Sequence, residues 1–524
     1  MRTSVQQVQC ALDADDATLA LCDGVDQIIH VEPALPEEAG RWLDLATRCE
    51  YNLLNAAAAS GVSRATVLGS MEVFMPYPVH YGVMPDWQPL PACSLASLGP
   101  HMAEHVAREF AICSSVRIFL ARIGTLVTDA PAADATDAPR WWITAAEVAE
   151  ALTAEVLADD LADSGAGTDL YSRNPFVRWN LARGGLSPFL VGSPWVAANG
   201  GTPSWVAPPP PAQPPIKHPP TGGSKPLALL LGGSGMFGPD IIPNIENEFD
   251  IRITDVIDRP TIRDEAQVMR WDTGNETTTA AAPDALDMDA NKQGDHEWQS
   301  VDISNYEEVE AATVGTDVTM VLSVVRTHAV LSFDVNCKGV YNACRAAVAH
   351  GHSRLINTGP WSVVAGHQKT FYHNVNEETP AGTGLDLYSF TKGLGHEVSR
   401  VFTANFPAFH VLTTLHGSFP DPENGRGEHG TAKENQEGAW EAGSGLPQPF
   451  SATFRDSARA VAACLAVPLT SLPSQHESFF IVGNTPDGVF SNQKSKRILG
   501  WEPMDDLAKC LLRSNVDAPQ TRFL

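Results

Sequence analysis

An alternation of short apolar runs and longer helix-periodic segments limits the second half of this chain to few folds. Strands of four to eight residues separated by helices are typical of a parallel sheet covered by helices on both faces. The pattern therefore predicts a doubly wound α/β fold. Strands are expected over 227–231, 251–255, 318–325, 355–358 and 411–415, and helices over 237–248, 333–350 and 386–405.

A proline-rich segment divides the chain. Ten of the twenty-four residues in 203–226 are proline, and their fixed φ angles and missing N–H groups favour a semi-stiff spacer. With 524 residues, the chain exceeds the usual size of one domain, about 150 residues. We predict domains at 1–202 and 226–524 joined by a linker at 203–225, and interpret 273–298 as an irregular surface insertion.

The two halves share a repeat at a nearly constant offset. Gly24-Val-Asp26 corresponds to Gly315-Thr-Asp317 at an offset of 291. The segments 52–64 and 103–110 correspond to 342–354 and 395–402 at offsets of 290 and 292. This indicates two diverged copies of one fold. The first copy begins where the second has already reached about residue 301, so it has no counterpart of the second copy's first strands.

Charge and cysteine content exclude several classes of function. A formal net charge of −27 repels both nucleic acid and an anionic membrane surface, so we expect neither as a partner. The nine cysteines show no CxxC spacing, which indicates reduced thiols and no zinc or other metal site. The first residues have no apolar core of signal-peptide type, and no apolar run is long enough to span a membrane. We expect a cytoplasmic protein.

A glycine-rich turn follows the apolar run 227–231. The sequence Gly232-Gly-Ser-Gly235-Met236-Phe237-Gly238 permits a tight turn whose N–H groups reach a pyrophosphate at the start of a helix. A glycine-rich turn after an apolar strand can also be a tight turn that binds no ligand. Asp255 ends the next strand, 20 residues after Gly235, where a carboxylate can accept hydrogen bonds from ribose hydroxyls and repel a 2′-phosphate.

The glycine turn followed by Asp255 predicts NAD rather than NADP as the cofactor, a preference that the nearby Arg259 moderates. Asp255 could otherwise be a solvated acid at a strand end.

Tyr388 and Lys392 lie four residues apart, on one face of the helix expected over 386–405. A fixed ammonium stabilises a phenolate and lowers the pKa of the phenol, so the pair can exchange a proton with a substrate hydroxyl while a hydride moves. Alone, this spacing is common in amphipathic surface helices. Because the pair follows the glycine turn by about 155 residues, the Tyr/Lys spacing becomes a specific signal of a catalytic pair.

Together, these motifs make residues 226–515 resemble the extended short-chain dehydrogenase/reductase superfamily, the branch of NAD-dependent epimerases and dehydratases. The resemblance implies a Rossmann-like fold in which Gly232, Gly235, Met236, Phe237, Gly238, Asp255, Asp302, Ile303, Tyr388 and Lys392 bind the cofactor. It also implies a small substrate lobe, mainly within 417–524. Further matches are Gly315-Thr-Asp317, Asn336 ahead of Gly339, the stretch 453–460, and Leu499-Gly-Trp501-Glu-Pro503, which resembles a closing motif of that lobe.

The segment around Thr358 departs from the family pattern. It lacks the serine pair that usually supplies a third catalytic hydroxyl; Thr358 is the best substitute, with Ser362 next. Gly359-Pro360 stands where family dehydratases carry an Asp-Glu pair, which disfavours a sugar 4,6-dehydratase. His416 could bind substrate or be a packed loop histidine.

The first copy resembles a degraded member of the same superfamily. It has no lysine before Lys217, and the counterpart of Tyr388 falls on Ala96 or Leu98. Relatives commonly dimerise through the helices that correspond to 333–350 and 386–405. Because 42–60 and 98–112 preserve those helices in the first copy, we predict an intramolecular pseudo-dimer and a chain that is monomeric in solution.

The leading hypothesis is an NAD-dependent oxidoreductase or epimerase acting on a hydroxyl-bearing small molecule, with a nucleotide sugar as a candidate. Tyr388 would be the acid/base, Lys392 the cation that lowers its pKa and binds ribose, and Thr358 the hydroxyl that orients the substrate. The alternative is a catalytically idle protein that senses NAD(H) or serves as a scaffold.

Overall fold

The chain divides into two compact units, Met1–Ala212 and Gln213–Leu524, and this border falls within the predicted linker. The computed structural model describes residues 8–12, 15–31, 39–77, 83, 87–129, 141–157, 177–181, 225–235, 237–256, 296–325, 329–365, 375–377, 382–417, 419, 450–484 and 489–507. Residues 203–224 of the linker, most of the predicted insertion, Met236 and Arg259 therefore lie outside the described residues.

The second unit is built on a seven-stranded sheet with the order β13-β12-β11-β10-β7-β8-β9. All neighbouring strands are parallel. The chain starts in the middle at β7, proceeds to one edge and then crosses to β10, so the direction of winding reverses between β7 and β10. This confirms the doubly wound prediction. The strands are β7 (Leu227–Leu231), β8 (Asp250–Asp255), β9 (Glu297–Ser300), β10 (Val318–Val321), β11 (Arg354–Pro360), β12 (His410–His416) and β13 (His476–Phe480).

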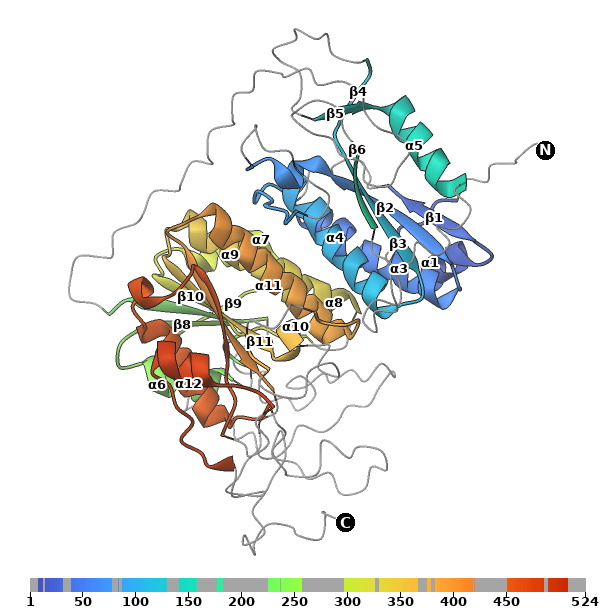
Figure 1. Ribbon diagram of the computed structural model, residues 1–524. Helices are drawn as coiled ribbons and strands as arrows, with labels where there is room; N and C mark the ends of the chain where they lie inside the picture. Colours follow the sequence, from blue (N-terminus) through green and yellow to red (C-terminus); the bar gives the residue numbers. More distant parts are fainter. Residues whose placement is uncertain are drawn as a thin grey trace, which may run out of the picture. The chain divides into compact units, whose positions relative to one another are not determined.

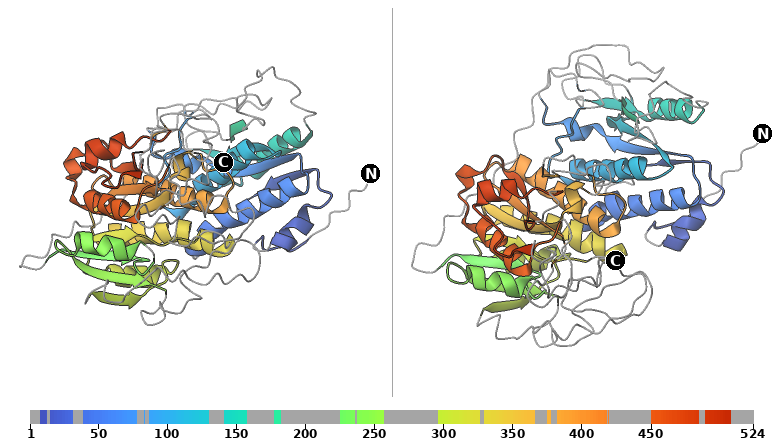
Figure 2. Two further views of the ribbon diagram at one scale, coloured as in Figure 1. Left: turned by 90° about the horizontal axis from the view of Figure 1, so that it is seen from below. Right: turned by 60° about the horizontal axis from the view of Figure 1, so that its bottom comes forward.

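Helices cover both faces of this sheet (Figures 1 and 2). On one face lie α6 (Gly238–Ile245) and α12 (Phe454–Ala466), whose buried residues, among them Ile241 and Val461, join Ile356 and Phe479 of the strands in one apolar core. The other face carries α7 (Tyr306–Thr313), α9 (Gly339–Ala349) and α11 (Leu387–Asn405). Short helices α10 (Ser362–Ala365) and η8 (Leu469–Ser471) and the π turn η9 (Ser495–Leu499) complete the described part of the unit.

The helix predicted over 333–350 is interrupted by a π turn. It consists of α8 (Ala329–Phe333), the π turn η5 (Asp334–Lys338) and α9. Two glycines permit close packing here: a Cβ on Gly339 would lie 2.9 Å from Cγ2 of Ile303, and one on Gly395 would lie 2.2 Å from the carbonyl oxygen of Asn336. Periodicity alone could not reveal this turn, because one extra residue per turn barely changes the apolar pattern.

Two predicted boundaries were wrong. Pairing in the strand expected over 318–325 stops at Val321. Glu297 and Trp298, placed in the irregular insertion, begin the edge strand β9, which is too short to show a clear alternation. Within 417–524, β13 joins the main sheet and α12 packs on it; 420–449 and 508–524 lie outside the described residues, and the small substrate lobe stays a prediction.

The closing motif of the sequence is fastened to the start of α12. The indole N–H of Trp501 donates to the carbonyl of Asp456 at 2.9 Å. The main-chain N–H groups of Met504 and Asp505 donate to the Asp456 carboxylate at 2.8 and 3.0 Å. This carboxylate is almost fully buried, so the segment after Trp501 depends on it for its position.

The first unit contains a parallel four-stranded sheet with the order β1-β2-β3-β6. On one face α4 packs on β2 and β3, α3 packs on α4, and α1 packs on α3. Apolar residues of α5 cover the opposite face. The elements are α1 (Asp15–Cys22), β1 (Gln27–His30), α2 (Ala39–Asp44), η1 (Leu45–Cys49), α3 (Glu50–Ala59), β2 (Arg64–Ser70), η2 (Met71–Phe74), α4 (Leu95–Cys113), β3 (Arg117–Ile123), β4 (Thr125–Val127), β5 (Trp142–Thr144), α5 (Ala145–Leu157) and β6 (Val177–Leu181).

The two units follow the same order of elements. The strands β1-β2-β3-β6 are arranged as β10-β11-β12-β13 are, and the π turn η1 precedes α3 as η5 precedes α9. Both α4 and α11 contain 19 residues. A shortened copy of the same fold would have this order of elements. The duplication itself stays a prediction.

Two other predictions concern the whole chain. Within the described segments no helix combines the length and apolar character that a bilayer crossing needs. The cysteines in those segments are free thiols, and most of them are buried.

Candidate functional site

The predicted site residues gather at the carboxyl ends of β7, β8, β10 and β11, where the winding direction reverses. Open parallel sheets bind ligands at this place. The segments after β7 and β10 approach each other closely there: a Cβ on Gly232, whose φ is +80°, would lie 2.5 Å from Oγ and 2.6 Å from the main-chain nitrogen of Ser323. Only glycine fits at this position.

The three glycines of the turn have different structural roles. The N–H groups of Gly232 and Gly233 both donate to the carbonyl of Thr254, at 2.8 and 3.0 Å, which ties the turn to β8. A Cβ on Gly238 would lie 1.8 Å from the carbonyl oxygen of Gly233. Gly235 is exposed, and a Cβ there would meet only the Gly232 carbonyl oxygen, at 3.3 Å. Packing of the turn therefore requires Gly232 and Gly238 but not Gly235.

The acidic residues lie on the β8 side of the turn. Asp255 ends β8, is half-buried, and accepts a hydrogen bond from the N–H of Val256 at 2.8 Å. Asp302 follows β9 and accepts from the N–H of Ser304 at 2.9 Å, which shapes the turn into α7. Ile303 is 4% exposed and packs against Gly339, so its side chain has a role in packing.

Lys392 connects the ends of two central strands. Both it and Tyr388 lie on α11, whose first turn is capped by Asp386 through the N–H of Ser389 at 2.9 Å. Lys392 is 3% exposed, and its ammonium donates to the carbonyls of Ser323, at 2.8 Å, and Thr358, at 3.2 Å. These bonds hold a positive charge one helical turn from the phenol, at the carboxyl edge of the sheet.

Asn336 supports this arrangement from the π turn η5. Its amide accepts from the N–H of Val325 at 3.2 Å and donates to the Val325 carbonyl at 2.6 Å. It also donates to the hydroxyl of Thr391, beside Lys392, at 3.0 Å. Sequence reasoning named Asn336 only as part of the resemblance; nothing in its local pattern predicted that a fully buried amide would join the segment after β10 to α11.

The two candidate hydroxyls have different partners. Thr358 donates to the carbonyl of Val321 at 3.0 Å, and strand alternation places its side chain on the same sheet face as Ile356, the face that α6 covers. Its carbonyl, rather than its hydroxyl, contacts Lys392. Ser362 lies 2.6 Å from the hydroxyl of Ser389, which directly follows Tyr388 on α11. The contacts therefore favour Ser362.

His416 lies at the carboxyl end of β12 on the face covered by α6 and α12. It is 6% exposed, and its ring meets the ring of Phe237 edge-on at a centroid distance of 5.1 Å. Burial lowers the pKa of His416 to about 3. The imidazole is therefore neutral at physiological pH.

The first unit has no such arrangement on α4. Because α4 and α11 are equally long, Ala96 and Pro100 stand where α11 has Tyr388 and Lys392. A Cβ on Gly99 would lie 1.1 Å from the indole of Trp42, so an indole packs directly on this part of the helix. No Tyr/Lys pair exists there, as the sequence predicted.

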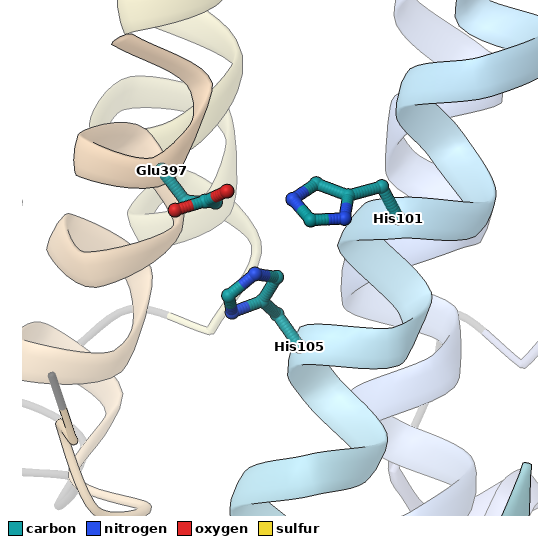
Figure 3. A group of neighbouring side chains, drawn as sticks. All are labelled: His101, His105 and Glu397. Carbon is teal, nitrogen blue, oxygen red and sulfur yellow. The ribbon is translucent and has the colours of Figure 1, made fainter. Parts of the chain in front are cut away.

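Two histidines project from the same side of α4, one turn apart (Figure 3). The ring centroids of His101 and His105 are 4.7 Å apart. Two imidazoles can begin a metal site, although structural zinc sites use four protein ligands. Glu397, also drawn in Figure 3, lies on α11, where it binds Arg400.

Comparisons with known proteins concern the second unit. Residues 229–406 match the model of the 3-beta hydroxysteroid dehydrogenase/isomerase family. No curated protein sequence matches the chain.

Several solved structures share part of the architecture. The uronate dehydrogenase from Agrobacterium tumefaciens is 18% identical over 56% of this chain and 88% of its own, with a TM-score of 0.37. The UDP-glucuronic acid 4-epimerase from Bacillus cereus is 14% identical over 54% and 93%, with a TM-score of 0.39. The UDP-glucose 4-epimerase from Thermotoga maritima is 12% identical over 54% and 95%, with a TM-score of 0.37. Likeness of this degree says nothing about what this chain binds.

Proposed function

We propose that the second unit is an NAD-dependent oxidoreductase or epimerase of the extended short-chain dehydrogenase/reductase superfamily, acting on a hydroxyl-bearing small molecule. The observation that carries the proposal is the position of Lys392. Its buried ammonium is held by two carbonyls at the reversal of the sheet, one turn after Tyr388. A structural lysine of an amphipathic helix would expose its ammonium to solvent instead.

The residues present fit a dinucleotide. The turn after β7 leaves Gly235 exposed at the sheet edge with room for a ligand to approach its backbone. Asp255 ends the neighbouring strand and can accept hydrogen bonds from ribose hydroxyls. Its negative charge would repel a 2′-phosphate, which favours NAD over NADP.

Tyr388 and Lys392 would handle the proton. Bound NAD supplies the acceptor for a hydride from the carbon that carries the substrate hydroxyl. The Tyr388 phenolate takes the proton of that hydroxyl, and the Lys392 charge stabilises the phenolate. Ser362 is placed better than Thr358 to orient the substrate oxygen, since its hydroxyl lies beside the residue after Tyr388. A nucleotide sugar is the first substrate class to screen.

The decisive experiment measures cofactor affinity and turnover in parallel. The wild-type protein is titrated with NAD and then incubated with a panel of sugar nucleotides while NADH absorbance and product configuration are followed. A dehydrogenase accumulates NADH, whereas an epimerase returns the hydride and accumulates none.

Two variants assign the roles. Tyr388→Phe should lower turnover by at least two orders of magnitude and leave NAD affinity nearly unchanged, whereas Lys392→Ala should weaken both. Near wild-type turnover by Tyr388→Phe would contradict the mechanism. NAD binding without turnover of any hydroxyl-bearing compound would favour the alternative, a catalytically idle NAD(H) sensor. The observation that supports this alternative is that the Thr358 hydroxyl donates to the carbonyl of Val321.

The first unit would act as the partner of the second. Its α3 and α4 keep the order of α9 and α11, but Ala96 and Pro100 stand where a catalytic helix needs a phenol and an ammonium. We therefore propose that the unit is retained to cover apolar helix faces, as an intramolecular pseudo-dimer requires.

A further inference from the structure

One imidazole nitrogen of His416 has no hydrogen-bond partner within the described part of the chain. Its Nδ1 is fully buried and unpaired, whereas its Nε2 lies 2.8 Å from the hydroxyl oxygen of Thr414. Thr414 donates its own proton to the carbonyl of Asn357 at 3.4 Å. The hydroxyl oxygen must then accept from Nε2–H, so the hydrogen-bond network assigns the proton of the neutral ring to Nε2. Nδ1 is left as an acceptor.

The surroundings of His416 make this unpaired acceptor costly. The rings of Phe237, Phe419 and Phe454 form one aromatic cluster around it, with the His416 centroid 5.1 Å from Phe237 and 5.9 Å from Phe419. None of these rings can donate a hydrogen bond to Nδ1. If packing were the only role of this position, phenylalanine would serve better than histidine, because it leaves no polar atom unpaired.

The position of His416 indicates which part of a ligand it would meet. In the sheet order β12-β11-β10-β7-β8, Asp255 at the end of β8 and His416 at the end of β12 lie on opposite sides of β7 and its glycine turn. Phe237, which His416 touches, directly precedes α6 after that turn. A dinucleotide whose adenosine ribose binds Asp255 would extend toward the β10–β12 side, where α11 supplies Tyr388 and Lys392.

We propose that Nδ1 of His416 accepts a hydrogen bond from the nicotinamide half of the bound dinucleotide, through either its carboxamide N–H or a ribose O–H. This inference rests on the proposed function and adds a cofactor contact to it. Because burial lowers the pKa of His416 to about 3, the ring is neutral and the acceptor is present at physiological pH.

The experiment compares two variants of His416 with the wild-type chain. His416→Phe keeps the ring shape and removes the acceptor. His416→Asn is the matched control, since its Oδ1 lies near the place of Nδ1. Dissociation constants for NAD and for ADP-ribose, which lacks nicotinamide, are measured by calorimetry, and the melting temperature of each ligand-free protein is recorded.

The expected result is that His416→Phe binds NAD about tenfold more weakly, while His416→Asn stays within about threefold of wild type. The ligand-free melting temperature of His416→Phe should be unchanged or higher. If the donor is the carboxamide, ADP-ribose affinity is the same in all three proteins; if it is the ribose hydroxyl, His416→Phe weakens ADP-ribose as well. Equal NAD affinity of wild type and His416→Phe would overturn the inference alone. A wild-type chain that binds neither ligand would overturn the proposed function and this contact with it.

Discussion

Replacing two glycines of the same turn should separate folding from cofactor binding. In Gly232→Val the new Cβ would overlap main-chain atoms of Ser323, 2.6 Å away at the nitrogen and 2.7 Å at Cα, on a residue whose φ is +80°. In Gly235→Val the nearest atom is a carbonyl oxygen at 3.3 Å, and φ is not in the left-handed region. The first change forces main-chain atoms apart, whereas the second requires one carbonyl oxygen to move by only a few tenths of an ångström.

The expected magnitudes follow from these contacts. A non-glycine residue in the left-handed region costs about 1–2 kcal/mol, and forcing extra atoms into a packed site adds about 1–3 kcal/mol. Gly232→Val should therefore lose about 2–5 kcal/mol of unfolding free energy, a fall in melting temperature of roughly 5 °C or more. Gly235→Val should keep its melting temperature within about 2 °C and lose NAD binding, because its side chain would cover the surface that a pyrophosphate must approach.

The assay is a thermal melt of the ligand-free protein together with an NAD titration of each variant. Wild-type NAD affinity in Gly235→Val would show that the glycine turn is only a turn. A large drop in the melting temperature of Gly235→Val would refute the structural distinction between the two glycines.

Four further outcomes are expected. NAD should bind at least tenfold more tightly than NADP, about 1.4 kcal/mol, and Asp255→Ala should abolish this preference; equal affinities in the wild type would contradict the role of Asp255. Asp456→Ala should lower the unfolding free energy by about 1–3 kcal/mol in denaturant titration, because the N–H groups of Met504 and Asp505 lose their buried acceptor; a loss below about 0.5 kcal/mol would show that the closing segment does not depend on it. Burial lowers the pKa of His396 from 6.5 to about 4, with Glu397 and Arg400 acting in opposite directions. The unfolded state therefore takes up the proton first, so the unfolding free energy should fall by at most about 3 kcal/mol as the pH drops from 6.5 toward 4. An equally steep decline in His396→Gln would show that His396 is not the cause. The fragment 226–524 should aggregate or dimerise, and a stable, fully active monomer in sedimentation would refute the pseudo-dimer.

The sequence alone determined the class of fold and the candidate residues of the site. Apolar runs and helical periods depend on which residues are adjacent, so β7, β10, β11 and β12 could be predicted from local pattern. The glycine turn, Asp255 and the Tyr388/Lys392 spacing are local as well, since each motif lies within one turn, strand end or helix. The constant offset between the halves needed no structure either.

Short and non-local features escaped sequence reasoning. The edge strand β9 has only four residues, and the π turn η5 leaves the apolar period almost unchanged. Pairing of β13 with β12 joins residues more than sixty positions apart in sequence, so no local pattern placed it in the main sheet.

Only the tertiary structure decided which contacts each candidate residue makes. It showed that the Lys392 ammonium donates to a carbonyl just after β10 and to one in β11, that the Thr358 hydroxyl donates to Val321, and that Ser362 lies beside Ser389 of α11. It also distinguished Gly235, which packing leaves unconstrained, from Gly232, which packing requires, and left one nitrogen of His416 unpaired. These facts depend on atoms that meet through folding from distant parts of the chain, and their distances and directions are not contained in the order of the residues.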